Sequence, residues 1–143
     1  MEFLPEIKRS CNSVINITTG AGLGMTIDQR LEAAESVAPE VASMNMGSLN
    51  FNISAAASSV PEFKHAWEKP YLENTKDFIL TNTFTQIEQG IERLSKNGTR
   101  FEFECYDIGH LYNLKIGLII QSFLNRNTGN SCHLTYKVVT VSK

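Results

Sequence analysis

Three short β-rich segments separated by helical segments limit the folds open to this chain more than any other feature. Residues 13–18 are rich in β-branched side chains and predict a strand. Residues 41–46 alternate polar and apolar side chains and predict a second, and residues 100–106 alternate strictly and predict a third. Strands that alternate with helices are typical of α/β proteins with a parallel sheet.

The segments between these strands carry helix signals. Thr26 is a suitable N-cap residue, and Asp28 follows in the first turn, where a negative charge is favourable. Residues 84–96 have the period of an amphipathic helix. Its apolar face contains Phe84, Ile87, Ile91 and Leu94. Residues 52–62, rich in Ser, Ala and Asn, predict a long loop.

Polar side chains occur where each predicted strand ends. They are Thr18 and Thr19 on the first strand, Ser43 and Asn45 on the second, and Glu104 and Asp107 on the third. The carboxyl ends of parallel strands are where α/β proteins place their chemistry. We therefore expect a site at this edge of the sheet.

The first strand runs directly into a glycine-dense loop at residues 18–24. Its Gly20-x-Gly22-x-Gly24 spacing differs from both the dinucleotide fingerprint and the P-loop. Backbone N–H groups in such a loop, followed by a helix N-terminus, can hold a carboxylate or a phosphate. Glycines that only make a tight turn give the same pattern, so the spacing leaves both interpretations open.

Glu102 and Glu104 are two residues apart on the third strand and therefore face the same side of the sheet. Carboxylates inside a covered parallel sheet are costly unless a cation or a substrate pairs with them. On an antiparallel edge strand the same glutamates would simply face solvent. The parallel arrangement favours a functional role for Glu104, which lies nearer the strand end.

Metal and thiol chemistry have little support in the residue pattern. The sequence has no HxH, HExxH or paired cysteine motif, and His110 is best interpreted as a turn or helix-start histidine. Cys11, Cys105 and Cys132 are widely spaced, which predicts free thiols in a reducing compartment.

Composition excludes two classes of partner. The formal net charge of -2 gives no electrostatic reason to bind nucleic acid. No apolar run approaches the ~18 residues of a membrane span, and the N-terminus lacks the order of a signal peptide. We expect a cytoplasmic protein that binds neither nucleic acid nor membrane.

Four runs of residues, in order along the chain, resemble one family. They are NITTG at residues 16–20, PEVASMNMGSLNF at 39–51, FILTNTF at 78–84 and GTRFEFECYDIGHL at 98–111. Together they resemble the β-keto acid cleavage enzymes, of which the 3-keto-5-aminohexanoate cleavage enzyme is the best-known type. The resemblance implies a TIM (β/α)8 barrel whose third to fifth strands are the three predicted here. It also implies a zinc-dependent reaction in which a β-keto acid and acetyl-CoA give acetoacetate and a new CoA thioester.

The resemblance further implies a substrate site on these strands. The matching residues are Thr18, Gly20, Ala21, Ser43, Asn45 and Glu104. Thr18 matches the hydroxyl residue that binds the substrate carboxylate, and Ala21 replaces the second glycine of a pair. Ser43 and Asn45 match polar pocket residues, and Glu104 matches the carboxylate that faces the distal end of the substrate. No catalytic residue and no metal ligand of the family has a match in this chain.

The departures from the family pattern concern metal and length. The family holds its zinc with an HxH on the second strand and a glutamate on the eighth, and neither is present, so we expect this chain alone to bind no zinc. A whole barrel needs ~250 residues, whereas the chain has 143. Residues 1–114 are therefore expected to form about three βα units of a barrel, and 115–143 an unmatched basic tail. The stretch after Asp107 contains no acidic residue at all.

Two functions follow from these observations. The first is a β-keto acid cleavage enzyme that uses acetyl-CoA, belongs to a family of homo-oligomers and is represented here by part of its barrel. The alternative is a catalytically inactive, truncated product that at most binds small carboxylates or associates with another chain.

Overall fold

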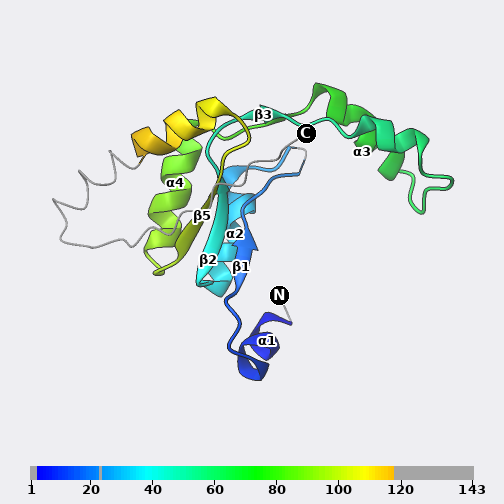
Figure 1. The fold of residues 1–143 in the computed structure, drawn as a ribbon. Coiled ribbons are helices and arrows are strands. Elements are labelled where there is room, and N and C mark those ends of the chain that lie inside the picture. Colours follow the sequence, from blue (N-terminus) through cyan, green and yellow to red (C-terminus); the bar gives the residue numbers. More distant parts are fainter. Residues whose placement is uncertain (1–2, 23, 118–143) are drawn as a thin grey trace.

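A three-stranded parallel sheet forms the centre of the protein (Figure 1). The computed structural model describes residues 3–22 and 24–117. The strands lie side by side in the order β1 (Asn16–Thr18), β2 (Val41–Asn45) and β5 (Arg100–Glu104), and both pairings are parallel. The predicted α/β class with a parallel sheet is thus confirmed. The first strand is shorter than predicted, because residues 13–15 precede the paired segment.

Two helices connect these strands and pack on the sheet. In α2 (Ile27–Val37) the predicted N-cap is confirmed, since the Thr26 hydroxyl accepts from the Gln29 N–H and the Gln29 side chain accepts from the Thr26 N–H. In α4 (Phe84–Ser95) Thr83 and Gln86 make the same capping box. Each box satisfies two N–H groups that the first turn would otherwise leave without a partner.

The strand register gives the sheet one apolar face and one polar face. Side chains opposite each other in a parallel register point to the same side. The apolar face carries Ile17, Ala42, Met44, Phe101 and Phe103. The polar face carries Asn16, Thr18, Val41, Ser43, Asn45, Arg100, Glu102 and Glu104.

The helices cover the apolar face and form the core with it. The helix residues in that core are Leu31 and Ala34 of α2 and Ile87 and Leu94 of α4. Ile91 packs at its margin, whereas Phe84, predicted to face the core, is 50% exposed at the first turn of α4. The core therefore lies on one side of the sheet, and the polar face is on the other.

Further elements lie at the carboxyl end of the three strands (Figure 1). The strands β3 (Leu49–Asn50) and β4 (Ile79–Leu80) pair antiparallel there. Between them are the 3-10 helices η1 (Ser54–Ser58) and η2 (Thr75–Asp77) and the helix α3 (Glu68–Asn74). The loop predicted for residues 52–62 thus contains a 3-10 turn that the composition did not indicate.

Two helical segments lie at the ends of the described chain. At the amino end, α1 (Leu4–Ser10) buries no residue and is held by an ion pair of 2.9 Å between Lys8 and Glu40. At the other end, residues 108–117 are helical and follow β5. None of the helices within the described ranges combines the length and the apolar character that a membrane crossing requires.

The predictions for the cysteines and the tail are covered by the structure only in part. Cys11 and Cys105 are free thiols, exposed and buried respectively, while Cys132 lies outside the described residues. So does all but the first few residues of the tail predicted for 115–143.

Candidate functional site

The carboxyl ends of β1 and β2 place two hydroxyl groups next to each other on the polar face. Thr18 and Ser43 are register partners, and the Ser43 Oγ donates to the Thr18 Oγ1 at 3.4 Å. The Gly20 N–H donates to the same Thr18 oxygen at 3.1 Å. Thr18 is exposed and Ser43 is buried, with 7% of its surface accessible. The structure thus brings together Thr18, Gly20 and Ser43 at a point that a ligand can reach.

The carboxyl ends of β2 and β5 place an amide beside a carboxyl group. Asn45 and Glu104 are register partners on the polar face. Asn45 is only 5% exposed, and within the described residues its buried Oδ1 has no hydrogen-bond partner. Burial, and secondarily the charge of Glu102, raise the pKa of Glu104. This end of the polar face therefore offers a free acceptor and a carboxyl group that is protonated more readily than usual.

Glu102 has a structural partner. The Asn16 Nδ2 donates to the Glu102 Oε2 across the full width of the sheet, at 2.5 Å. The expectation that parallel pairing covers both faces of the sheet is not met here, because α2 and α4 pack on the apolar face and Thr18 and Arg100 on the other remain exposed. The polar face is accessible to a ligand for this reason.

Two of the predicted strand-end residues lie away from the polar face. Thr19 follows β1 and is buried, and its Oγ1 donates to the Ser43 backbone carbonyl at 2.7 Å. Asp107 is exposed, and its Oδ1 accepts from the His110 N–H at 3.1 Å at the start of the last described helix. Neither residue is among the substrate-binding residues that the family resemblance implies, and in the structure both stabilise the backbone.

The glycine-dense loop divides between the polar face and β4. Gly20 lies beside Thr18, and a Cβ at Gly20 would come within 3.2 Å of the Thr18 Oγ1. Ala21 instead lines a hollow of about 220 Å³ that the loop forms with Phe78, Ile79 and Thr81. Of the two positions, Gly20 is the one whose lack of a side chain leaves room for the Thr18 hydroxyl.

A buried arginine that belongs to no sequence motif lies behind this edge. Arg30 of α2 is 4% exposed and donates to the Thr19 carbonyl at 2.9 Å, the Thr81 carbonyl at 2.8 Å and the Asn82 Oδ1 at 2.6 Å. The sequence does carry a signal for it, because Arg30 interrupts the otherwise apolar face that Ile27, Leu31 and Ala34 form. A charged residue at a core-facing position usually has fixed partners.

His110 and Asn113 extend the polar contacts along the same edge. The His110 Nδ1 accepts from the Tyr106 N–H at 3.2 Å, and its Nε2 lies 3.3 Å from the Ser48 carbonyl. The Asn113 Nδ2 donates to the Met46 carbonyl at 2.8 Å. These contacts fit the prediction of a helix-start histidine, and they also join the last described helix to the chain after β2.

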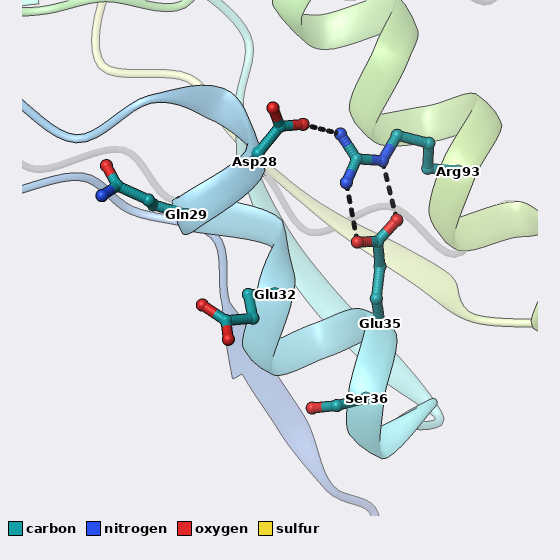
Figure 2. A pocket seen from close by; sticks show the side chains of 6 residues that line it. All are labelled: Asp28, Gln29, Glu32, Glu35, Ser36 and Arg93. Atoms are coloured by element: carbon teal, nitrogen blue, oxygen red, sulfur yellow. Dashed lines mark hydrogen bonds and ion pairs between the residues drawn. The ribbon is translucent and has the colours of Figure 1, made fainter.

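A larger hollow of about 550 Å³ lies along α2, with Arg93 of α4 as the one lining residue from the other helix (Figure 2). Arg93 makes paired hydrogen bonds of 2.7 Å to both oxygens of Glu35 and a third of 2.5 Å to Asp28. Figure 2 shows these three groups turned toward one another. Arg93 is thus paired with two acids of the facing helix. The interactions at this hollow are ion pairs that join α2 and α4. The described part of the chain holds no group of three or more potential metal-ligating residues.

The fold and the polar face define an α/β protein with a candidate ligand site at the carboxyl ends of its parallel strands. A family profile described as beta-keto acid cleavage enzyme matches residues 1–126. The chain belongs to this family, as the sequence motifs indicate. The family match extends past Leu111, where the last motif ends, and into the segment predicted as an unmatched tail.

One relative gives a more specific comparison. It is the 3,5-dioxohexanoate:acetyl-CoA acetone transferase of Paraburkholderia graminis, which is 52% identical over 113 residues. The aligned part is 79% of this chain and 36% of the relative. The chain therefore spans about a third of the length of the relative that it matches.

Proposed function

We propose that this chain provides the acid-binding part of an enzyme that cleaves a β-keto acid with acetyl-CoA. In that reaction the β-keto acid and acetyl-CoA give acetoacetate and a new CoA thioester. The observation that carries the proposal is the polar face itself, where the parallel register places Thr18 beside Ser43 and Asn45 beside Glu104. Family membership and the name of the relative support the reaction class.

The three strands are, in this proposal, the third to fifth strands of a TIM barrel. One feature supports that placement. The helices α2 and α4 cover only the apolar face, as the outer ring of helices does in a barrel. The polar face would then point into the barrel, and its carboxyl-terminal edge would lie at the end where barrel enzymes bind substrate.

The two ends of the polar face suit the two ends of a β-keto acid. Near β1, the Thr18 hydroxyl can donate to a carboxylate, with Gly20 and Ala21 providing the adjacent backbone. In the middle, Ser43 and Asn45 line the path of the carbon chain. Near β5, burial raises the pKa of Glu104 and so disfavours its charged form; when protonated, this carboxyl group would donate a hydrogen bond to a neutral carbonyl such as the distal ketone of 3,5-dioxohexanoate. We therefore propose a substrate of this class, with its carboxylate toward Thr18.

We propose that full-length members of the family use zinc and acetyl-CoA and associate with themselves. The described residues do not fit a zinc site, because they contain no suitable group of ligands, and we derive no step through the metal. We propose that zinc is held by other strands of the family barrel and that this chain alone binds none. Measurement of the zinc content of the purified chain tests this directly.

Calorimetric titration with acetoacetate and with acetone tests the binding role. Acetone is the ketone that remains when acetoacetate loses its carboxyl group, so the pair isolates carboxylate recognition. We expect saturable binding of acetoacetate and at least about tenfold weaker binding of acetone, because a charge-assisted hydrogen bond is lost. Equal affinity for both ligands, or no binding of either, would contradict the proposal.

A turnover assay separates the enzyme from the inactive alternative. The chain is incubated with acetyl-CoA and 3,5-dioxohexanoate, and acetoacetate is measured. Acetoacetate formation above the uncatalysed rate supports an enzyme, whereas acetoacetate binding without turnover supports a chain that only binds carboxylates.

A further inference from the structure

Arg30 is a buried cation whose hydrogen-bond partners are neutral groups. Its guanidinium donates to two backbone carbonyls and one amide oxygen, and within the described ranges it makes no ion pair. Burial lowers the pKa of Arg30, although an arginine keeps its charge at any ordinary pH. Arg93, by contrast, has two carboxylate partners. Within the described residues no paired carboxylate cancels the positive charge of Arg30. Its electric field therefore acts on the carbonyl and amide dipoles that Arg30 contacts.

One of these dipoles leads directly to the candidate site. Arg30 Nε donates to the Thr19 carbonyl at 2.9 Å. The N–H of the same peptide group belongs to Gly20 and donates to the Thr18 Oγ1 at 3.1 Å. A peptide whose carbonyl binds a cation is a stronger donor at its N–H, because hydrogen bonds in a chain polarise one another. Arg30 is thus connected to the Thr18 hydroxyl through a single peptide group.

The Thr18 hydroxyl has its acceptor positions occupied from inside the protein. A hydroxyl oxygen accepts up to two hydrogen bonds and donates one. The Gly20 N–H and the Ser43 hydroxyl both donate to the Thr18 oxygen, so the Thr18 proton remains to be donated. Because Thr18 is exposed on the polar face, that proton can be donated to a ligand group that accepts hydrogen bonds, such as a carboxylate.

We propose that Arg30 is a positioning residue that, through the Thr19–Gly20 peptide, sets the Thr18 hydroxyl as a donor for an anionic ligand. The inference rests on the proposed function, since that function assigns the carboxylate of the substrate to Thr18. Arg30 itself touches no substrate. Its contact with Asn82 and Thr81 holds the loop after β4 against the same peptide.

A purely structural role for Arg30 makes different predictions. In that case Arg30 holds two loops together, and any variant that loses the contacts lowers stability and affinity in parallel. If Arg30 acts through Thr18, its effect on a ligand depends on the presence of the Thr18 hydroxyl. It also depends on the positive charge, which Arg30→Lys keeps and Arg30→Met removes.

The first measurement is the ¹H shift of the Gly20 amide in the ligand-free 143-residue chain. A stronger hydrogen bond moves this resonance downfield, so we expect an upfield shift in Arg30→Met and a smaller one in Arg30→Lys. Arg93→Met is the control, because it removes an arginine of equal size from the helical side. A Gly20 resonance that is unchanged in a folded Arg30→Met or Arg30→Lys chain would overturn the proposal.

The second measurement is a double-mutant cycle on the affinity for acetoacetate. We expect Arg30→Met to weaken binding about tenfold, Arg30→Lys about threefold and Thr18→Val about tenfold. In the Thr18→Val background, Arg30→Met is expected to weaken binding less than about twofold further. Additive losses would overturn the proposal and leave a structural role. If the unmodified chain binds no acetoacetate, the proposed function fails, and the Gly20 resonance still decides the role of Arg30.

Discussion

Asn45 and Glu104 lie opposite each other in the parallel register of β2 and β5, and the buried Oδ1 of Asn45 has no hydrogen-bond partner within the described residues. A buried polar atom without a partner is costly, and a bound ligand can supply the missing contact. The neighbouring carboxyl group of Glu104 has a raised pKa, and burial is again the main cause. This pair marks the part of the polar face that a bound ligand would change most.

Replacement of Asn45 by leucine is expected to separate stability from binding. Leucine has a similar size and leaves no acceptor without a partner, so the free energy of unfolding should stay the same or rise. Acetoacetate affinity should fall. Asn82→Leu is the matched control, because the Asn82 side chain accepts from Arg30 and donates to the Gly47 carbonyl.

Asn82→Leu should lower the free energy of unfolding by about 2–4 kcal/mol, because it removes one hydrogen-bond partner of the buried Arg30. Chemical denaturation of both variants provides the comparison. An Asn45→Leu chain as unstable as Asn82→Leu would show that Asn45 has a structural role instead.

Glu104 should make the stability of the chain depend on pH. Its folded-state pKa is above the unfolded-state value. The stabilising contribution of Glu104 is therefore fully present below the unfolded-state pKa and is lost as the pH rises through the folded-state pKa. Glu104→Gln, which cannot ionise, should be more stable than the unmodified chain at neutral pH and no more stable in acid.

Thermal unfolding from about pH 3 to about pH 8 measures this effect. Glu88→Gln, an exposed substitution on α4, is the control and should follow the unmodified chain throughout. If the curves of Glu104→Gln and the unmodified chain stay parallel over that range, Glu104 is not responsible for the pH dependence.

The residue that ends α2 offers a stabilising substitution. Ala38 has a φ of 47°, in the left-handed region, where a Cβ is unfavourable. Ala38→Gly should raise the free energy of unfolding by about 1 kcal/mol. Gly98 has a φ of +76°, and an added methyl group would meet no atom within 4 Å, so Gly98→Ala should lower the free energy of unfolding by a similar amount through backbone strain alone. Denaturant titration of both variants checks that the two effects have opposite signs.

The ion pairs of Arg93 should stabilise the contact between α2 and α4 in a salt-dependent manner. Arg93→Met removes the paired hydrogen bonds to Glu35 and the contact with Asp28 and should cost about 1 kcal/mol at low salt. In about 1 M salt the difference should shrink, because exposed charges are screened. Lys96→Met is the control, since its pair with Glu92 is exposed on both sides and should contribute almost nothing. A loss that is the same at both salt concentrations would mean that Arg93 acts by packing its alkyl chain.

Most of the parallel sheet and both of its helices could be predicted, because local signals and tertiary structure agree there. Thr26 is the N-cap of α2 in the prediction and in the structure, and the alternation of residues 100–104 matches the two faces of β5. The expectation of a site at the carboxyl ends of the strands also led to four residues that share one face, because all three strands run in parallel. They are Thr18, Ser43, Asn45 and Glu104. Their roles in binding stay predictions.

Two of the elements that the sequence did not predict, β3 and β4, depend on a contact between distant parts of the chain. The strands β3 and β4 have two residues each and exist through pairing with each other, so neither has a periodic pattern of its own. Strand-end position alone does not say which side chains share a face: Thr19 also lies at the end of β1, yet it is buried and its hydroxyl donates to the Ser43 carbonyl. Two of the three partners of Arg30 are backbone carbonyls, which no sequence motif displays.

The most direct test of the polar face as the ligand site is a ¹H–¹⁵N titration of the 143-residue chain with acetoacetate. We predict saturable shifts at the amides of the proposed site, which are those of Thr18, Gly20, Ala21, Ser43, Asn45 and Glu104. The amides around Asp28, Glu35 and Arg93 on the helical side should stay in place. Shifts confined to that helical side, or none that saturate, would contradict a ligand site on the polar face.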